Sequence, residues 1–122
     1  MDRSRQGGIA MEKMYQFILW LVPAVEKFPR SRKFLLGDRI QATAMEIQEA
    51  LIAATYSRKP LPQLFDANLQ LEKLRIQMRL AYDLRSVDMR RYEFAVRSID
   101  EIGRMVGGWI KVQHAEKASQ SV

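Results

Sequence analysis

The stretch QLFDANLQLEKLRIQMRLAYDL, residues 63–84, decides the fold class. Its apolar residues recur at alternating spacings of three and four, at Leu64, Ala67, Leu71, Leu74, Met78 and Ala81. That spacing places them on one face of an α-helix, because a helix completes a turn every ~3.6 residues. A helix with one apolar face buries that face against other elements. The stretch therefore predicts one helix of a larger helical assembly.

Three other stretches show the same spacing. The first runs from about Ala10 to Lys27, the second from a cap at Ser31 to about Tyr56, and the last from a cap at Ser86 or Asp88 to about Val112. Their apolar faces carry Met14, Phe17, Leu21, Val25 and Phe28, then Leu36, Ile40, Ala44, Ile47, Leu51 and Ala54, and finally Tyr92, Ala95, Ile99, Ile102, Val106 and Trp109. No segment alternates as a half-buried strand does.

Short connections separate these four helices: Phe28-Pro29, a proline-marked loop over residues 57–62, and a tight turn over residues 86–88. Helices joined by short loops pack antiparallel to their neighbours. The sequence therefore predicts an all-α fold, an antiparallel up-down-up-down four-helix bundle over residues 10–112. The polar segments 1–9 and 113–122 are expected to be flexible.

The balance of charge is basic. Twenty Lys and Arg residues stand against 14 Asp and Glu in 122 residues, for a formal net charge of +6. Such a charge favours contact with nucleic acid, an anionic membrane or an acidic protein. The longest apolar run, Phe17 to Val25, is far shorter than the ~20 residues of a membrane span, so no membrane association and a cytoplasmic location are expected.

The basic residues gather where the chain reverses direction. Antiparallel helices bring the first and third connections to the same end of the bundle. The residues that flank them are Lys27, Arg30, Arg32, Lys33, Arg85, Arg90 and Arg91, with only Glu26, Asp83 and Asp88 nearby in sequence. This predicts a polyanion-binding surface, with a solvated end that has no partner as the alternative.

A second basic line follows the third helix. Arg75 and Arg79 lie one turn apart beside the apolar face, with Lys73 close by and Tyr82 continuing the line. The arginines are candidate nucleic-acid contacts, but they could instead pair with carboxylates of a neighbouring helix or subunit. Tyr82 could stack on a base, although packing between helices is the more common use of such a residue.

Two features predict contact between subunits. The first helix is apolar on nearly every side around Pro23, so Phe17, Trp20 and Leu21 are expected at a subunit interface. Gly103 and Gly107 lie one turn apart in the last helix, where each glycine costs about 1 kcal/mol relative to alanine. They make a smooth strip where another helix could approach closely, within or between subunits.

Candidate catalytic groups are scarce. The sequence has no Cys, and its one His, His114, falls in the tail that is expected to be flexible. Glu46 and Glu49 share a helix face, but exposed carboxylates on a helix explain them more simply. No catalytic residue, metal ligand or cofactor site is therefore predicted, and the chain is not expected to be an enzyme.

Several segments in order resemble one known family. They are FPRSRKFLLGDRI (residues 28–40), ATYS (54–57), ANLQLEKLR (67–75), RLAYDL (79–84), YEF (92–94) and DEIGRMVGGWIK (100–111). The chain resembles the accessory variability determinant (Avd) proteins of diversity-generating retroelements. It is also similar to the four-helix-bundle proteins encoded in ribosomal-RNA intervening sequences.

The resemblance implies a basic four-helix bundle assembled as a homopentameric ring. It implies a non-enzymatic protein that binds RNA and DNA and associates with the reverse transcriptase of the retroelement. Such a protein supports mutagenic copying of a template RNA into cDNA. Two other functions stay open from the sequence: an intervening-sequence-type protein, and a structural adaptor for an acidic protein partner.

Overall fold

The computed structural model describes residues 3–120, and their regular structure is helical. The elements are α1 (Arg3–Glu26), the short α2 (Arg30–Arg32), the π-helical turn η1 (Lys33–Gly37), α3 (Asp38–Thr55), α4 (Leu61–Asp83) and α5 (Met89–Gln120). The all-α prediction is confirmed for this part of the chain. None of these helices is long and apolar enough to cross a membrane.

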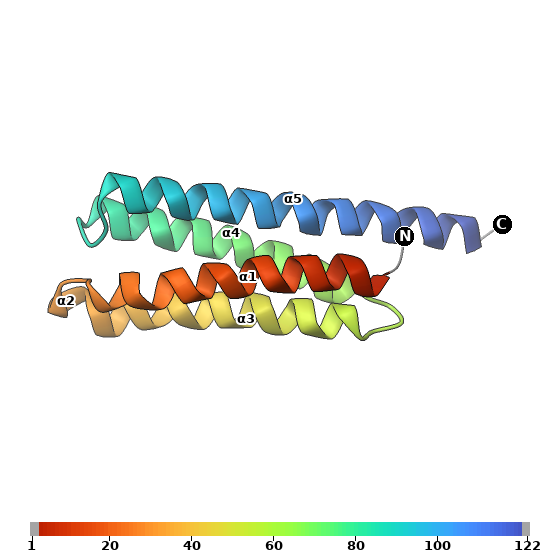
Figure 1. Cartoon of the computed structure of the whole chain (residues 1–122), viewed down its shortest axis with the longest axis horizontal. Coiled ribbons are helices and arrows are strands. Elements are labelled where there is room, and N and C mark those ends of the chain that lie inside the picture. The colour runs from red at the N-terminus through yellow and green to blue at the C-terminus, as the bar shows by residue number, and fades with distance from the viewer. Residues whose placement is uncertain (1–2, 121–122) are drawn as a thin grey trace.

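Four long helices pack against each other in an elongated bundle (Figure 1). Each of α1 and α4 contacts both α3 and α5, so the order around the bundle is α1, α3, α4, α5. Successive long helices run in opposite directions, as predicted for a four-helix bundle. The α1–α3 and α4–α5 connections consequently lie at the same end, on the left in Figure 1.

The predicted apolar faces form the core. The six apolar residues that were predicted on one face of residues 63–84, which we call the apolar stripe of α4, are all buried. Of these, Leu64, Leu74 and Ala81 have no solvent-exposed surface. The stripes of α3 and α5 are buried from Ile40 to Ala54 and from Ala95 to Trp109. The predicted stripe residues of α1, Met14, Phe17, Leu21 and Val25, are buried as well, so the helical period identifies core residues on all four long helices.

Two helices are longer than predicted. α1 begins at Arg3 rather than Ala10, and α5 continues to Gln120 rather than Val112. Gly7 is buried where α1 crosses α3, since a Cβ there would lie 2.1 Å from Thr55 Oγ1. At the other terminus Gln113 is buried and the His114 ring lies 6.0 Å from that of Phe65. The predicted flexible segments are thus largely helical, and their residues 1–2 and 121–122 lie outside the described part.

The start of the second predicted helix also differs. Ser31 does not cap it, because α2 begins at Arg30 after Pro29 and has no side-chain cap. A π-helical turn, η1, follows and inserts an extra residue into the helical repeat. Leu36 is therefore only half-buried, and Phe34 and Leu35 are exposed. Gly37 is buried against α1, where a Cβ would come within 2.7 Å of Val25 Cγ1.

The apolar residues of α1 that were predicted at a subunit interface lie mostly inside the chain. Phe17 and Leu21 are 3% and 1% exposed, because they face the bundle core. Trp20 is half-buried, and its ring lies 4.6 Å from that of Phe94 on α5. α5 thus covers the side of α1 that was expected to need a second copy. Leu19 and Val22 remain exposed on α1.

Candidate nucleic-acid interface

The two basic connections meet at one end of the bundle, as the antiparallel topology predicts (Figure 1). A pocket there is lined by Ala24 and Lys27 from the end of α1, Arg85 and Ser86 from the α4–α5 turn, and Arg91 from the first turns of α5. We call it the cap pocket. Lys27 and Arg85 are distant in sequence but line the same depression, so the fold brings the two predicted basic corners together.

The remaining predicted cations surround this end. Arg30 and Arg32 form α2, Lys33 begins η1, and Arg90 lies in the first turn of α5. Together with Lys27, Arg85 and Arg91 they make up a surface that we call the basic cap. Among residues 3–120, Arg91 is the one member that forms a salt bridge, with Asp88 at 2.8 Å. The positive charge of the basic cap is therefore mostly uncompensated within the protomer.

Arg85 has an unusual backbone conformation. Its φ is 60°, and it is the one described non-glycine residue with a positive φ. Ser86 N donates to Ala81 O at 2.8 Å and Arg85 N donates to Tyr82 O at 2.9 Å. These two bonds form a Schellman motif, in which glycine is usual at the left-handed position. An arginine there costs about 1–2 kcal/mol, and its side chain projects from the turn into the basic cap.

Asp88 organises the start of α5. Its Oδ1 accepts a hydrogen bond from the backbone N of Arg91 at 2.8 Å, which confirms the predicted N-cap. Its Oδ2 accepts from Arg91 Nη1, also at 2.8 Å. One carboxylate therefore both caps the helix and holds the Arg91 guanidinium at the edge of the cap pocket.

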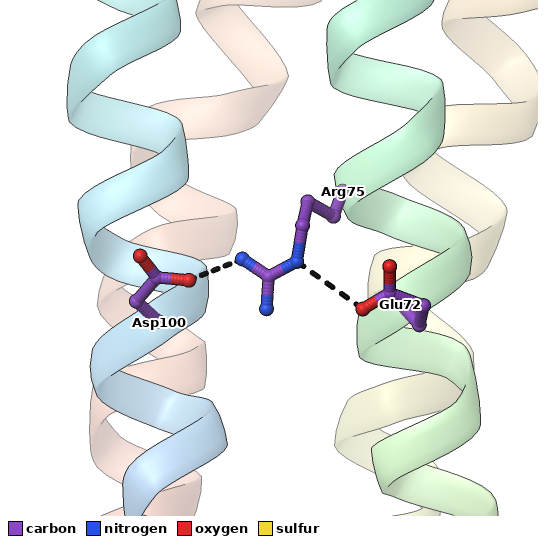
Figure 2. Close-up of polar contacts among 3 residues, drawn as sticks. All are labelled: Glu72, Arg75 and Asp100. Carbon is purple, nitrogen blue, oxygen red and sulfur yellow. Dashed lines mark hydrogen bonds and ion pairs between the residues drawn. The ribbon is translucent and has the colours of Figure 1, made fainter.

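Arg75 is not part of this surface. It lies on α4 and is bonded to Asp100 on α5 and, at 3.2 Å, to Glu72 on its own helix (Figure 2). Burial lowers the pKa of Arg75, but the hydrogen bonds to Asp100 and Glu72 outweigh it, so its pKa is raised above the ordinary value. The structure therefore favours the predicted alternative for Arg75, a bridge between two helices, over a nucleic-acid contact.

Of the other residues in the second basic line, Arg79 is exposed to solvent and Tyr82 packs between helices. Arg79 is exposed, and its Nε lies 3.8 Å from Asp83 Oδ2, a weak pair across one helical turn. The Tyr82 ring stacks on that of Tyr92, with centroids 4.7 Å apart and planes inclined by 15°. Tyr82 therefore packs between α4 and α5, as the structural alternative predicted.

A family comparison bears directly on this basic bundle. The sequence model of the family described as bAvd-like matches residues 9–113. This range includes all of α3 and α4, most of α1 and α5, and the entire basic cap. The chain belongs to the bAvd-like family.

The bAvd-like proteins are bacterial accessory proteins of diversity-generating retroelements, and the family is non-catalytic. The resemblance seen in the sequence is thereby confirmed, and an accessory role in a retroelement follows from it. No curated protein sequence has a significant match to the chain.

Gly103 and Gly107 were expected to allow close approach of another helix, either within or between subunits. A Cβ built at either position meets no atom within 4 Å, so no other described helix of this chain approaches them closely. Close packing within the subunit is therefore not the reason for these glycines. The alternative, approach of another subunit, stays a prediction.

Two exposed apolar residues beside the basic cap were not predicted. Phe34 is 66% exposed and Leu35 is 80% exposed, both in η1 and next in sequence to Arg32 and Lys33. Of these neighbouring residues only Leu36 was predicted in the buried stripe, and it is half-buried. The π-helical turn changes the register, and the sequence carries no plain signal for such a turn.

The bridge at Arg75 makes a testable prediction. Replacing Arg75 with Gln should lower the free energy of unfolding by about 1 kcal/mol, because the pair is only partly buried. Binding of RNA should be unchanged. Urea unfolding measures the first quantity and filter binding the second.

The control for this prediction is a double-mutant cycle with Asp100→Asn, which isolates the coupling between the two side chains. A clear loss of RNA affinity in Arg75→Gln with no loss of stability would return Arg75 to the nucleic-acid surface.

Proposed function

We propose that this bAvd-like protein is a non-enzymatic accessory subunit that binds nucleic acid through its basic cap. In this role it assists a reverse transcriptase in the mutagenic synthesis of cDNA. Family membership supports the retroelement setting. The binding of RNA or DNA rests on the physical character of the cap.

One observation carries the proposal: all cations of the basic cap except Arg91 are left without a salt bridge among the described residues. Lys27, Arg30, Arg85 and Arg90 are exposed, and none of them forms a salt bridge within the described chain. Crowding like charges at one end destabilises the compact state unless a counter-charge arrives. A nucleic-acid backbone supplies such a charge, and its binding releases condensed counterions.

The other end of the bundle offers a contrast. It also carries basic residues, including Arg58, Lys59 and Lys117. Arg58 and Lys117 have interaction partners within the chain, and Glu116 lines the same depression. Basic composition alone would not favour either end of the bundle as the site that binds nucleic acid. The cations without salt bridges at the basic cap favour that end.

Neutralising the cap should weaken binding without regard to sequence. In the variant Arg30→Gln/Lys33→Gln/Arg90→Gln, affinity for a structured RNA should fall at least about tenfold at low salt. The slope of log affinity against log salt should decrease by about two, because each lost phosphate contact removes ~0.7–0.9 of slope. Filter binding over a salt series measures both quantities.

A matched control removes the same charge elsewhere. The variant Lys73→Gln/Arg104→Gln/Lys111→Gln neutralises three exposed cations on α4 and α5 outside the cap, and it should keep most of the affinity. Equal losses in the two variants would contradict a localised site. No binding of wild-type protein at low salt would overturn nucleic-acid binding altogether.

Association with a reverse transcriptase is the second part of the proposal. The enzyme to test is one encoded beside this chain together with paired variable and template repeats. After nuclease treatment, the tagged accessory protein should still retain this polymerase in a pull-down. Loss of the polymerase on nuclease treatment would mean that RNA bridges the two proteins and that no direct contact exists.

We also propose that the protein assembles with itself, as a homopentameric ring. Support comes from apolar residues on the outer side of α4, where Phe65, Leu69, Ile76 and Leu80 are each about half exposed. They recur at helical spacing along one edge, so α4 is apolar toward solvent as well as toward the core. An extended apolar face of this kind is typical of a protein–protein interface.

Sedimentation equilibrium tests the assembly. Wild-type protein should have five times the chain mass of 14.2 kDa, and Ile76→Glu should lower the mass by placing a charge in the apolar face. Met45→Glu, on the exposed side of α3, serves as the control and should leave the mass unchanged. A monomeric wild type would exclude the ring, and an unaltered mass for Ile76→Glu would exclude the α4 face.

A further inference from the structure

The cap pocket differs from the rest of the basic cap because it is concave and has cations on several sides. Lys27 contributes from the turn that follows α1, Arg85 from the α4–α5 turn and Arg91 from α5. Arg30 and Arg90, by contrast, are exposed and do not line it. A strand that passes over a convex basic surface needs no such depression. The pocket therefore suggests a ligand group that enters it end-on.

The backbone at the pocket is held in a conformation that arginine disfavours. Arg85 occupies the left-handed position of the Schellman motif, where glycine would be unstrained. Strain of this kind persists where surrounding structure enforces it, and it concentrates at functional sites. The guanidinium of Arg85 has no salt-bridge partner among residues 3–120. The chain thus keeps a strained arginine that no intramolecular contact explains.

The lining of the pocket includes an unpartnered polar group as well. Ser86 lines the pocket and is 9% exposed, and its hydroxyl has no hydrogen-bond partner in the described structure. Buried hydroxyls in native proteins are nearly always hydrogen-bonded to protein or water, so this one is available to a water or a ligand in the pocket. The hydroxyl can rotate to donate to an anion that enters the pocket.

Two carboxylates lie on the pocket wall and limit which anions it can hold. Asp88 accepts hydrogen bonds from the backbone and side chain of Arg91, and Asp83 lies 3.8 Å from Arg79. Lys27 and Arg85 are thus the cations left for a ligand, with the donors of Arg91 that Asp88 does not use. A ligand with a single negative charge gains little here, whereas a group with about two charges and three free oxygens gains more.

We propose that the cap pocket binds the terminal phosphate monoester of a nucleic-acid strand, with Lys27, Arg85 and Arg91 as its ligands. A terminal monoester carries roughly −1.5 to −2 charges near pH 7 and three unesterified oxygens, against one charge for an internal phosphodiester. The planar guanidinium group of arginine can donate two parallel hydrogen bonds to the oxygens of such a phosphate. This inference rests on the proposed nucleic-acid binding and adds that the protein recognises a strand end, while the outer cations hold the adjoining backbone.

The test compares RNA 12-mers of one sequence, labelled internally, that carry a 5′-phosphate, a 3′-phosphate or hydroxyls at both ends. Fluorescence anisotropy with the full chain should show about tenfold tighter binding of one phosphorylated form than of the hydroxyl form. Arg85→Asn should abolish that preference, since asparagine tolerates the left-handed conformation but lacks the charge. Arg85→Gly should abolish it too while raising the melting temperature, which separates the binding defect from misfolding.

The matched control is Arg90→Asn, in the same region but outside the pocket. It should weaken binding of all three RNAs alike and leave their ratio unchanged. A preference that survives in Arg85→Asn would overturn the assignment to this pocket. Competition by a free nucleoside monophosphate as strong as that by the phosphorylated RNA would also overturn it, since the ligand would then be a nucleotide and not a strand end.

The two proposals fail differently. Equal binding of phosphorylated and hydroxyl RNA would end the strand-end proposal and leave nucleic-acid binding intact. No binding of any RNA at low salt would end both.

Discussion

Burial of one apolar stripe per helix is the constraint on which the rest of this structure depends. The stripes of α3, α4 and α5 can be covered together only if the helices pack side by side around one core. The short connections then force successive helices to run in opposite directions. Antiparallel packing in turn sets Lys27 beside Arg85, although they belong to different turns of the chain. The electrostatics of the basic cap thus follow from the hydrophobic core.

The paired and unpaired cations of the protein fall in different places. Midway along the bundle, Lys13 pairs with Glu101 between α1 and α5, and Arg75 joins Asp100 between α4 and α5. Carboxylates are therefore available where two helices meet along their length. At the basic cap they are few, and Asp88 is occupied by Arg91. If charges were placed for stability alone, the cations of the basic cap would have carboxylate partners, as Lys13 and Arg75 do between the helices. The basic cap is therefore better explained by an external anion.

The features that the sequence predicted well are those with a periodic signal. Every stripe residue of α4 is buried, because the helical repeat there is unbroken from Leu64 to Ala81. The ends of the helices were predicted less well, since they depend on contacts distant in sequence. Gly7 looks like a helix breaker until it is seen to pack against Thr55, and His114 looks like part of a polar tail until it meets Phe65. The role of Arg75 stayed open between two alternatives for the same reason, because its partner Asp100 belongs to another helix.

The remaining features that were not predicted arise from local backbone geometry for which the sequence has no clear signal. The π-helical turn exposes Phe34 and Leu35 next to the basic residues of α2, and the left-handed backbone of Arg85 turns a helix C-terminus without glycine. Both features lie at the same end of the bundle, and both are less favourable than the regular alternative. The unpaired cations lie there as well. Three separate departures from optimal stability thus coincide at the basic cap. A protein keeps such departures where its function requires them, so their coincidence with the unpaired cations favours a surface shaped by a ligand.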